Sequence, residues 1–173
     1  MAITNERVRE AYSEREAQAI YQEVRQCGDF AGFAQKFMHS DDSRVARNAL
    51  WTLTKASDSE LSQLQPLLDE LIDLAMLTES SAVRRLSLNL VERLDISEDD
   101  LRTDFLDFCL EHMADIAELP GVQSISMKLA FRMCQFYPEL MDEFRRTLEA
   151  MEISYYKPAV KSVRNRILAG KMK

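Results

Sequence analysis

The sequence is poor in the residues that form turns. Only 4 Gly and 4 Pro occur among the 173 residues, whereas average usage would make these two types roughly 12% of the chain. An all-β sandwich or barrel needs a turn about every 8–12 residues, so that fold class is excluded. We therefore expect an all-α protein, and the length suits a single domain over residues 1–173.

Cysteine and histidine are also scarce. The 3 cysteines and 2 histidines form no Cys-x-x-Cys or His-Glu-x-x-His pattern, so we expect neither a metal nor a cofactor. No Walker loop, dinucleotide-binding glycine motif or nucleophile elbow occurs, which indicates a non-catalytic protein. No stretch approaches the roughly 18 apolar residues of a membrane span, and the first residues form no secretory signal. We expect a cytoplasmic protein with free thiols and no membrane partner.

Four segments of the chain are similar to one another at a nearly constant interval. Each contains a valine, and successive valines are 38, 39 and 38 residues apart: Val45, Val83, Val122 and Val160. In the first three copies a small residue follows four positions later, and Leu or Met follows five positions later. Self-similarity at such a period is typical of solenoid proteins built from stacked helix pairs.

Each valine segment follows a second amphipathic segment, so the predicted unit is a helix, a short turn and a helix. In residues 60–78, leucines recur at helical spacing, and Ser57 provides the hydroxyl that starts such a helix. We place the repeats at residues 29–56, 57–94, 95–136 and 137–173. An N-terminal helix over residues 5–26 precedes them within residues 1–28.

The second helix of this unit resembles that of HEAT repeats, whose pattern is Asp-x-x-Val-Arg-x-x-Ala-x-x-x-Leu. Residues 42–53 (DSRVARNALWTL) follow it with the basic residue displaced by one position, and residues 81–91 (SAVRRLSLNLV) carry Arg84 in place. The third and fourth copies depart from it, because Gln123 replaces the arginine and Arg164 occupies the small-residue position. The resemblance implies an armadillo-like α-α superhelix of about four HEAT-like repeats.

The net charge of −7 conceals two layers of opposite sign. The valine-centred segments (residues 43–56, 81–94, 120–136 and 158–173) carry +3, +2, +2 and +5, together +12, and the rest of the chain carries −19. On a helical wheel, the positions two, six and ten after each valine share one face, opposite the valine. Seven of these twelve positions are Lys or Arg and none is acidic.

We predict that this face binds a partner, and the HEAT resemblance places it on the concave side of the solenoid. The candidate partner-binding residues are Arg47, Trp51, Lys55, Arg85, Asn89, Arg93, Lys128, Arg132 and Arg166. A row of like charges repels itself unless an anion relieves it, so we expect a protein or another anionic macromolecule in the groove. The alternative is that these cations form a solvated face or structural ion pairs, a role for which Arg44 and Arg84 are candidates.

A further interpretation of the same face is nucleic-acid binding. The chain is similar in fold and charge layering to the HEAT-like DNA alkylation repair glycosylases, whose basic concave face holds duplex DNA. That resemblance implies contact with the phosphate backbone, which needs only positioned Lys and Arg. No residue here aligns with the catalytic acid of those enzymes, so glycosylase activity is not implied. Nothing in the sequence indicates an oligomeric state.

Overall fold

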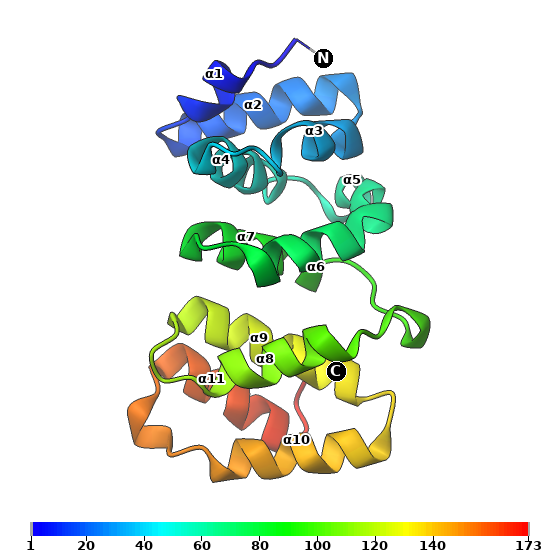
Figure 1. The fold of residues 1–173 in the computed structure, drawn as a ribbon, viewed down its shortest axis with the longest axis vertical. Helices are drawn as coiled ribbons and strands as arrows, with labels where there is room; N and C mark the ends of the chain where they lie inside the picture. Colours follow the sequence, from blue (N-terminus) through cyan, green and yellow to red (C-terminus); the bar gives the residue numbers. More distant parts are fainter. Residues whose placement is uncertain (1, 173) are drawn as a thin grey trace. The chain divides into compact units, whose positions relative to one another are not determined.

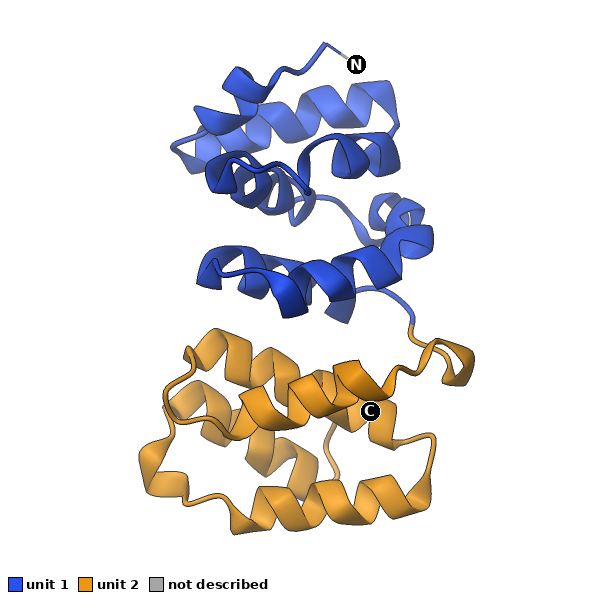
Figure 2. Cartoon of the chain, viewed as in Figure 1, with its two compact units in different colours: residues 1–95 blue, residues 96–173 orange. Residues whose placement is uncertain are grey.

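A computed structural model describes residues 2–172, and all regular elements in that range are helices (Figure 1). The predicted all-α class is confirmed. The chain divides into two compact units, Met1–Asp95 and Ile96–Lys173 (Figure 2). This boundary falls next to the predicted boundary between the second and third repeats, and the single domain over residues 1–173 stays a prediction. None of the described helices has the length and apolar character needed to cross a bilayer.

The N-terminal segment contains two helices, so the single helix predicted over residues 5–26 is wrong. Helix α1 spans Asn5–Arg9 and helix α2 spans Glu14–Cys27. Ser13 starts α2 through a capping box, in which its hydroxyl accepts the Glu16 N–H and the Glu16 carboxylate accepts the Ser13 N–H at 2.9 Å. Apolar periodicity does not register such a cap, which is why the interruption was missed.

The rest of unit 1 consists of packed helix pairs. Helix α3 (Phe30–Phe37) contacts α4 (Ser43–Leu53), and α6 (Leu68–Leu77) contacts α7 (Ser81–Glu92). α4 also contacts α7, the second helix of the following pair. The second helices of two consecutive predicted repeats therefore lie side by side.

The helix predicted over residues 60–78 is also interrupted. Helix α5 spans Asp58–Leu61, a 3-10 segment spans Ser62–Leu67, and α6 follows. Pro66 lies inside the 3-10 segment. Proline has no N–H to donate and its ring clashes with the preceding turn of an α-helix, which accounts for the tighter, irregular turn at this position.

Unit 2 begins with a 3-10 turn (Glu98–Asp100) and is organised around α9 (Pro120–Cys134), which contacts α8, α10 and α11. The bounds of those three helices are Thr103–Ala114 for α8, Pro138–Ala150 for α10 and Pro158–Leu168 for α11. A second 3-10 turn, Ile153–Tyr155, lies between α10 and α11. α9, α10 and α11 each carry proline in the first turn, where the missing N–H has no intrahelical partner to lose.

The repeated valines form part of the core of their units. Val45, Val83, Val122 and Val160 are at most 2% exposed. The Leu or Met five positions later is also buried in the first three copies. Because this side of each second helix faces the core, the positions two, six and ten residues after the valine lie toward the opposite side.

In three of the pairs a polar side chain of the second helix binds a carbonyl near the end of the first. Arg84 donates to the carbonyl of Ala75 at 3.0 Å, Gln123 to that of Asp115 at 2.6 Å and Arg164 to that of Leu148 at 2.7 Å. The last carbonyls of a helix have no partner within it. These bonds therefore fasten the two helices of a pair where they meet at the turn.

Candidate functional site

Two adjoining pockets lie where α4 and α7 meet in unit 1. Their volumes are about 330 and 300 Å³, and both are lined by Trp51, Arg85 and Leu86. The larger pocket is also lined by Thr54, Asn89, Glu92 and Arg93, and the smaller by Ala11, Tyr12, Arg47 and Asn48. We refer to the two pockets together as the unit 1 groove.

Most of the site residues predicted on α4 and α7 and just after their ends line this groove. Five of the six do so: Arg47, Trp51, Arg85, Asn89 and Arg93. Lys55 is not among the lining residues. The packing of α4 against α7 thus brings together side chains that are almost 40 residues apart in the sequence.

Arg47 and Arg85 face no carboxylate at hydrogen-bond distance within residues 2–172. The Arg47 Nε donates to the neutral Oδ1 of Asn48 at 3.2 Å. Arg85 is exposed and forms neither an ion pair nor a hydrogen bond with the described residues. Arginine stays protonated in proteins, so two positive charges without a carboxylate partner line the smaller pocket, whereas the larger pocket also contains the Glu92 carboxylate.

Lys55, in contrast, has a structural partner. Its Nζ forms an ion pair with the Glu14 carboxylate. The same Nζ lies 5.4 Å from the centroid of the Trp51 ring, within the range of a cation–π contact. Lys55 therefore connects the start of α2 to the end of α4, and its ammonium lies over the Trp51 ring.

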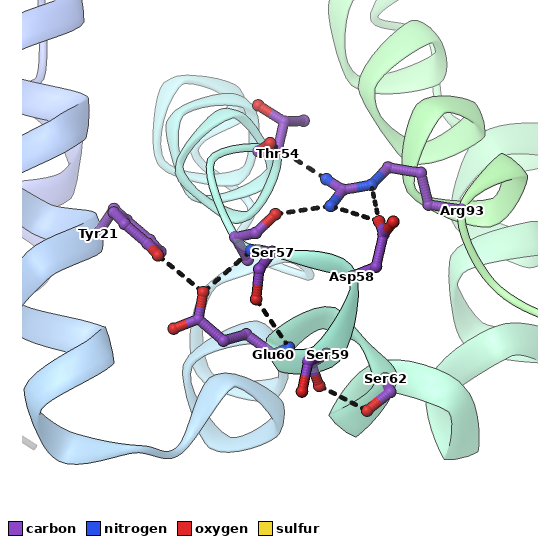
Figure 3. Close-up of polar contacts among 9 residues, drawn as sticks. Tyr21, Thr54, Ser57, Asp58, Ser59, Glu60, Ser62 and Arg93 are labelled. Atoms are coloured by element: carbon purple, nitrogen blue, oxygen red, sulfur yellow. Dashed lines mark hydrogen bonds and ion pairs between the residues drawn. The ribbon is translucent and has the colours of Figure 1, made fainter.

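Arg93 is engaged by one carboxylate and two carbonyls (Figure 3). Its Nε and Nη2 donate to Asp58 Oδ1 at 3.1 and 2.9 Å. Nη1 donates to the Thr54 carbonyl at 3.1 Å, and Nη2 to the Ala56 carbonyl at 2.6 Å. The guanidinium thus joins the end of α7 to the connection between α4 and α5, as the structural interpretation of these cations describes.

A second polar network in Figure 3 connects α2 to the start of α5. Glu60 Oε1 accepts the Ser57 N–H at 2.9 Å and the Tyr21 hydroxyl at 2.7 Å. Because both donors favour the charged carboxylate, they hold the pKa of Glu60 below its usual value. The same hydrogen bond raises the pKa of the Tyr21 phenol. This network is structural, since none of its members lines the groove.

Six lining residues were missed by the sequence analysis: Ala11, Tyr12, Asn48, Thr54, Leu86 and Glu92. Tyr12, in the connection between α1 and α2, is 69% exposed and borders the smaller pocket. A single tyrosine between two short helices belongs to no periodic pattern, so the sequence held no signal for it.

Asn48 is another of the missed residues, and it contacts a predicted one. It is 1% exposed, and its Nδ2 donates to the carbonyls of Val8 at 2.9 Å and Arg9 at 3.1 Å. With Oδ1 accepting from Arg47, Asn48 both fastens α1 to α4 and orients a groove cation. The sequence did contain a signal for Asn48. It is a polar residue next to the predicted face, at a helical position where burial is expected, and such a residue needs hydrogen-bond partners.

The remaining three predicted site residues belong to unit 2. Lys128 and Arg132 lie on α9, are half-buried and interact with neighbouring groups. Arg166 lies on α11 and is exposed. None of the three lines the unit 1 groove, and their participation in the same surface stays a prediction.

The described part of the chain contains no group of three or more His, Cys, Asp or Glu side chains arranged to hold a metal ion. In comparisons with known proteins, a family model for a HEAT repeat domain matches residues 4–171. No curated protein and no solved structure matches the chain.

Proposed function

The chain belongs to the HEAT repeat domain family, and from this premise we propose that it is a non-catalytic scaffold whose unit 1 groove binds an acidic segment of a partner protein. HEAT repeats are a protein-interaction architecture, since a stack of helix pairs offers an extended surface for binding. The family assignment supports the scaffold role. The identity of the ligand is inferred from the groove.

The observation that carries the proposal is the pair of uncompensated arginines. Lys55 and Arg93 have carboxylate partners of their own, whereas Arg47 and Arg85 line one pocket without any. Their mutual repulsion is relieved when a carboxylate binds between them. Arginine is suited to this ligand because its planar fork can donate two parallel hydrogen bonds to a carboxylate.

The other lining residues favour a polypeptide over a nucleic-acid backbone. Half-buried Trp51 and exposed Tyr12 offer apolar ring surface, and Asn89 offers a side-chain amide. Such a mixture suits a peptide with both apolar and acidic side chains. Tight binding to a phosphate backbone instead relies on many cations, about 6–10 phosphate contacts in well-studied cases, and the groove has two that are uncompensated.

The cysteines support a reducing compartment such as the cytoplasm for this scaffold. All three are free: Cys27 is exposed, and Cys109 and Cys134 are buried. Burial raises the pKa of the Cys109 thiol, and it raises the pKa of the Cys134 thiol to about 11. We refer to Cys109 and Cys134 as the buried thiols.

Two fluorescein-labelled probes, an acidic peptide of about 12 residues with interspersed leucines and a duplex DNA of about 20 base pairs, test the proposal. Binding is measured by anisotropy at low and at physiological salt. Trp51, the single tryptophan of the chain, lines both pockets, so its emission should change as the peptide binds.

The decisive variant is Arg47→Glu/Arg85→Glu. Its matched control is Arg145→Glu/Arg146→Glu, which makes the same charge change at two exposed positions of α10 in unit 2. We expect the groove variant to weaken peptide binding about 10-fold or more and the control to change it little, since close charge pairs contribute most. Equal losses in both variants would refute the groove. Tighter binding of the DNA, lost in the groove variant, would replace the peptide with a nucleic acid.

A further inference from the structure

Unit 2 exposes four large apolar side chains on two turns. Ile116 and Leu119, in the turn between α8 and α9, are 63% and 47% exposed, and Ile153 and Tyr155, between α10 and α11, are 36% and 68% exposed. They are four of the seven exposed large apolar side chains found in residues 2–172. Single apolar residues on a surface are normal, but a cluster marks an interaction surface. We call these four residues the turn edge of unit 2.

The two turns are neighbours in space as well as alike. The hydroxyl of Tyr156 donates to the carbonyl of Ala114 at 2.7 Å. Ala114 is the last residue of α8 and lies two residues before Ile116, and Tyr156 directly follows Tyr155. Figure 1 shows both connections on the same side of unit 2. The two turns that carry the four apolar side chains therefore lie next to each other.

The turn between α8 and α9 is held in a defined conformation. His112 Nδ1 and Glu118 Oε2 are 2.6 Å apart, the Ala117 N–H donates to Asp115 Oδ1 at 2.9 Å, and Gln123 donates to the Asp115 carbonyl at 2.6 Å. These bonds fix the backbone on both sides of the two exposed aliphatic residues. A surface that is already ordered loses less conformational entropy when a partner binds.

Acidic side chains outnumber basic ones in and next to the two turns, where Lys157, two residues after Tyr155, is the exposed cation. Asp107, Glu111 and Asp115 are exposed on α8 and at its end, and Glu152 is exposed next to Ile153. No Lys or Arg occurs in residues 103–119. A complementary partner therefore carries apolar side chains together with positive charges.

We propose that the turn edge of unit 2 is a docking surface for an amphipathic helix of a partner protein, with aliphatic residues on one face and Lys or Arg beside them. An anionic lipid surface does not fit, because the acidic side chains around the edge would be repelled by it. A symmetric dimer through this edge does not fit either, because it would bring the same acidic residues of two copies together. The proposal is independent of the unit 1 groove.

The test uses a labelled helical peptide of about 18 residues, composed of Leu and Lys with leucines at helical spacing, and a scrambled peptide of the same composition. Anisotropy gives the affinity of the full chain for each. We expect the helical peptide to bind about 10-fold more tightly than the scrambled one, and Ile116→Ser/Leu119→Ser to remove most of that difference.

Leu77→Ser is the matched control, because Leu77 is an aliphatic side chain at the end of a first helix in unit 1 and is 81% exposed. It should leave binding unchanged, whereas Tyr155→Ser, on the other turn, should weaken it. Circular dichroism checks that each variant is folded. Equal binding of the two peptides, or an equal loss with Leu77→Ser, would overturn the proposal. So would a dimer of the wild-type chain in sedimentation equilibrium that Ile116→Ser/Leu119→Ser dissociates, since a second copy would then cover the edge.

Discussion

Replacement of Asn48 with alanine should destabilise unit 1, because this buried side chain binds the end of a very short helix. Its Nδ2 donates to the Val8 carbonyl at 2.9 Å and to the Arg9 carbonyl at 3.1 Å. Both carbonyls belong to the last turn of α1, which spans five residues. A helix this short is not stable alone, so its position depends on tertiary bonds of this kind.

The loss in the free energy of unfolding depends on how many hydrogen bonds Asn48→Ala removes and on which groups keep another partner. The Val8 carbonyl also accepts the Ala11 N–H at 3.3 Å, so it keeps a partner and the full penalty for an unsatisfied buried carbonyl does not apply. A typical net hydrogen bond contributes about 0.5–1.5 kcal/mol. Three are lost, but the half-buried Arg47 can donate to water in place of Asn48 Oδ1, so the two bonds to the carbonyls set most of the loss. We therefore expect the free energy of unfolding to fall by about 2 kcal/mol. With a urea dependence of about 1–3 kcal/mol per molar, the midpoint falls by roughly 1 M.

Urea titration monitored by Trp51 fluorescence measures this loss in unit 1, where Trp51 lies on α4. Asn48→Asp keeps the shape but cannot donate to the carbonyls, so it should destabilise at least as much as alanine. Asn89→Ala is the control, since Asn89 is half-buried on α7 and makes no hydrogen bond with the described residues. A loss below about 0.5 kcal/mol for Asn48→Ala, or wild-type stability for Asn48→Asp, would refute the reasoning.

Three further predictions concern two polar contacts of unit 1 and the accessibility of the cysteine thiols. Arg93→Ala should lower the free energy of unfolding by about 1–2 kcal/mol. Asp58→Asn should lower it by less than about 1 kcal/mol, because the Asp58 side chain is 87% exposed. Equal losses for the two variants in urea titrations would contradict this prediction. The pKa of the Glu60 carboxyl is lower in the folded protein than in the unfolded chain. The charged carboxylate therefore stabilises the fold at pH values above the unfolded-state pKa of Glu60. This stabilisation is lost as the pH falls through the folded-state pKa of Glu60. Glu60→Gln should therefore flatten the acid side of the stability profile followed by circular dichroism, and an unchanged profile would count against it. An alkylating agent at mildly alkaline pH should label Cys27 in the native protein but not the buried thiols, and mass spectrometry showing more than one label would contradict the assignment.

The repeat could be predicted because it depends on which residues are apolar and how far apart they are. Val45 and Val83 are buried as the spacing predicted, since the residues that face the core recur with the period of the helix. Interruptions of helices were predicted less well. Ser13 can cap a helix and Pro66 can interrupt one, and both effects are seen in the structure. The prediction instead continued one helix across each residue, because the apolar residues on both sides keep the helical spacing.

For the candidate site, the amino-acid order alone was enough to place cations on the side of α4 and α7 opposite the anchor valines, because position on a helix follows from residue spacing. Which of these cations keep an uncompensated charge depended on the packing of separate helices. Lys55 is paired with Glu14, 41 residues away, and Arg93 with Asp58, 35 residues away. Arg47 and Arg85 meet no carboxylate in the described chain and line one pocket with Trp51. Contacts over such separations are set by the relative positions of helices in three dimensions, and no spacing along a single helix records them.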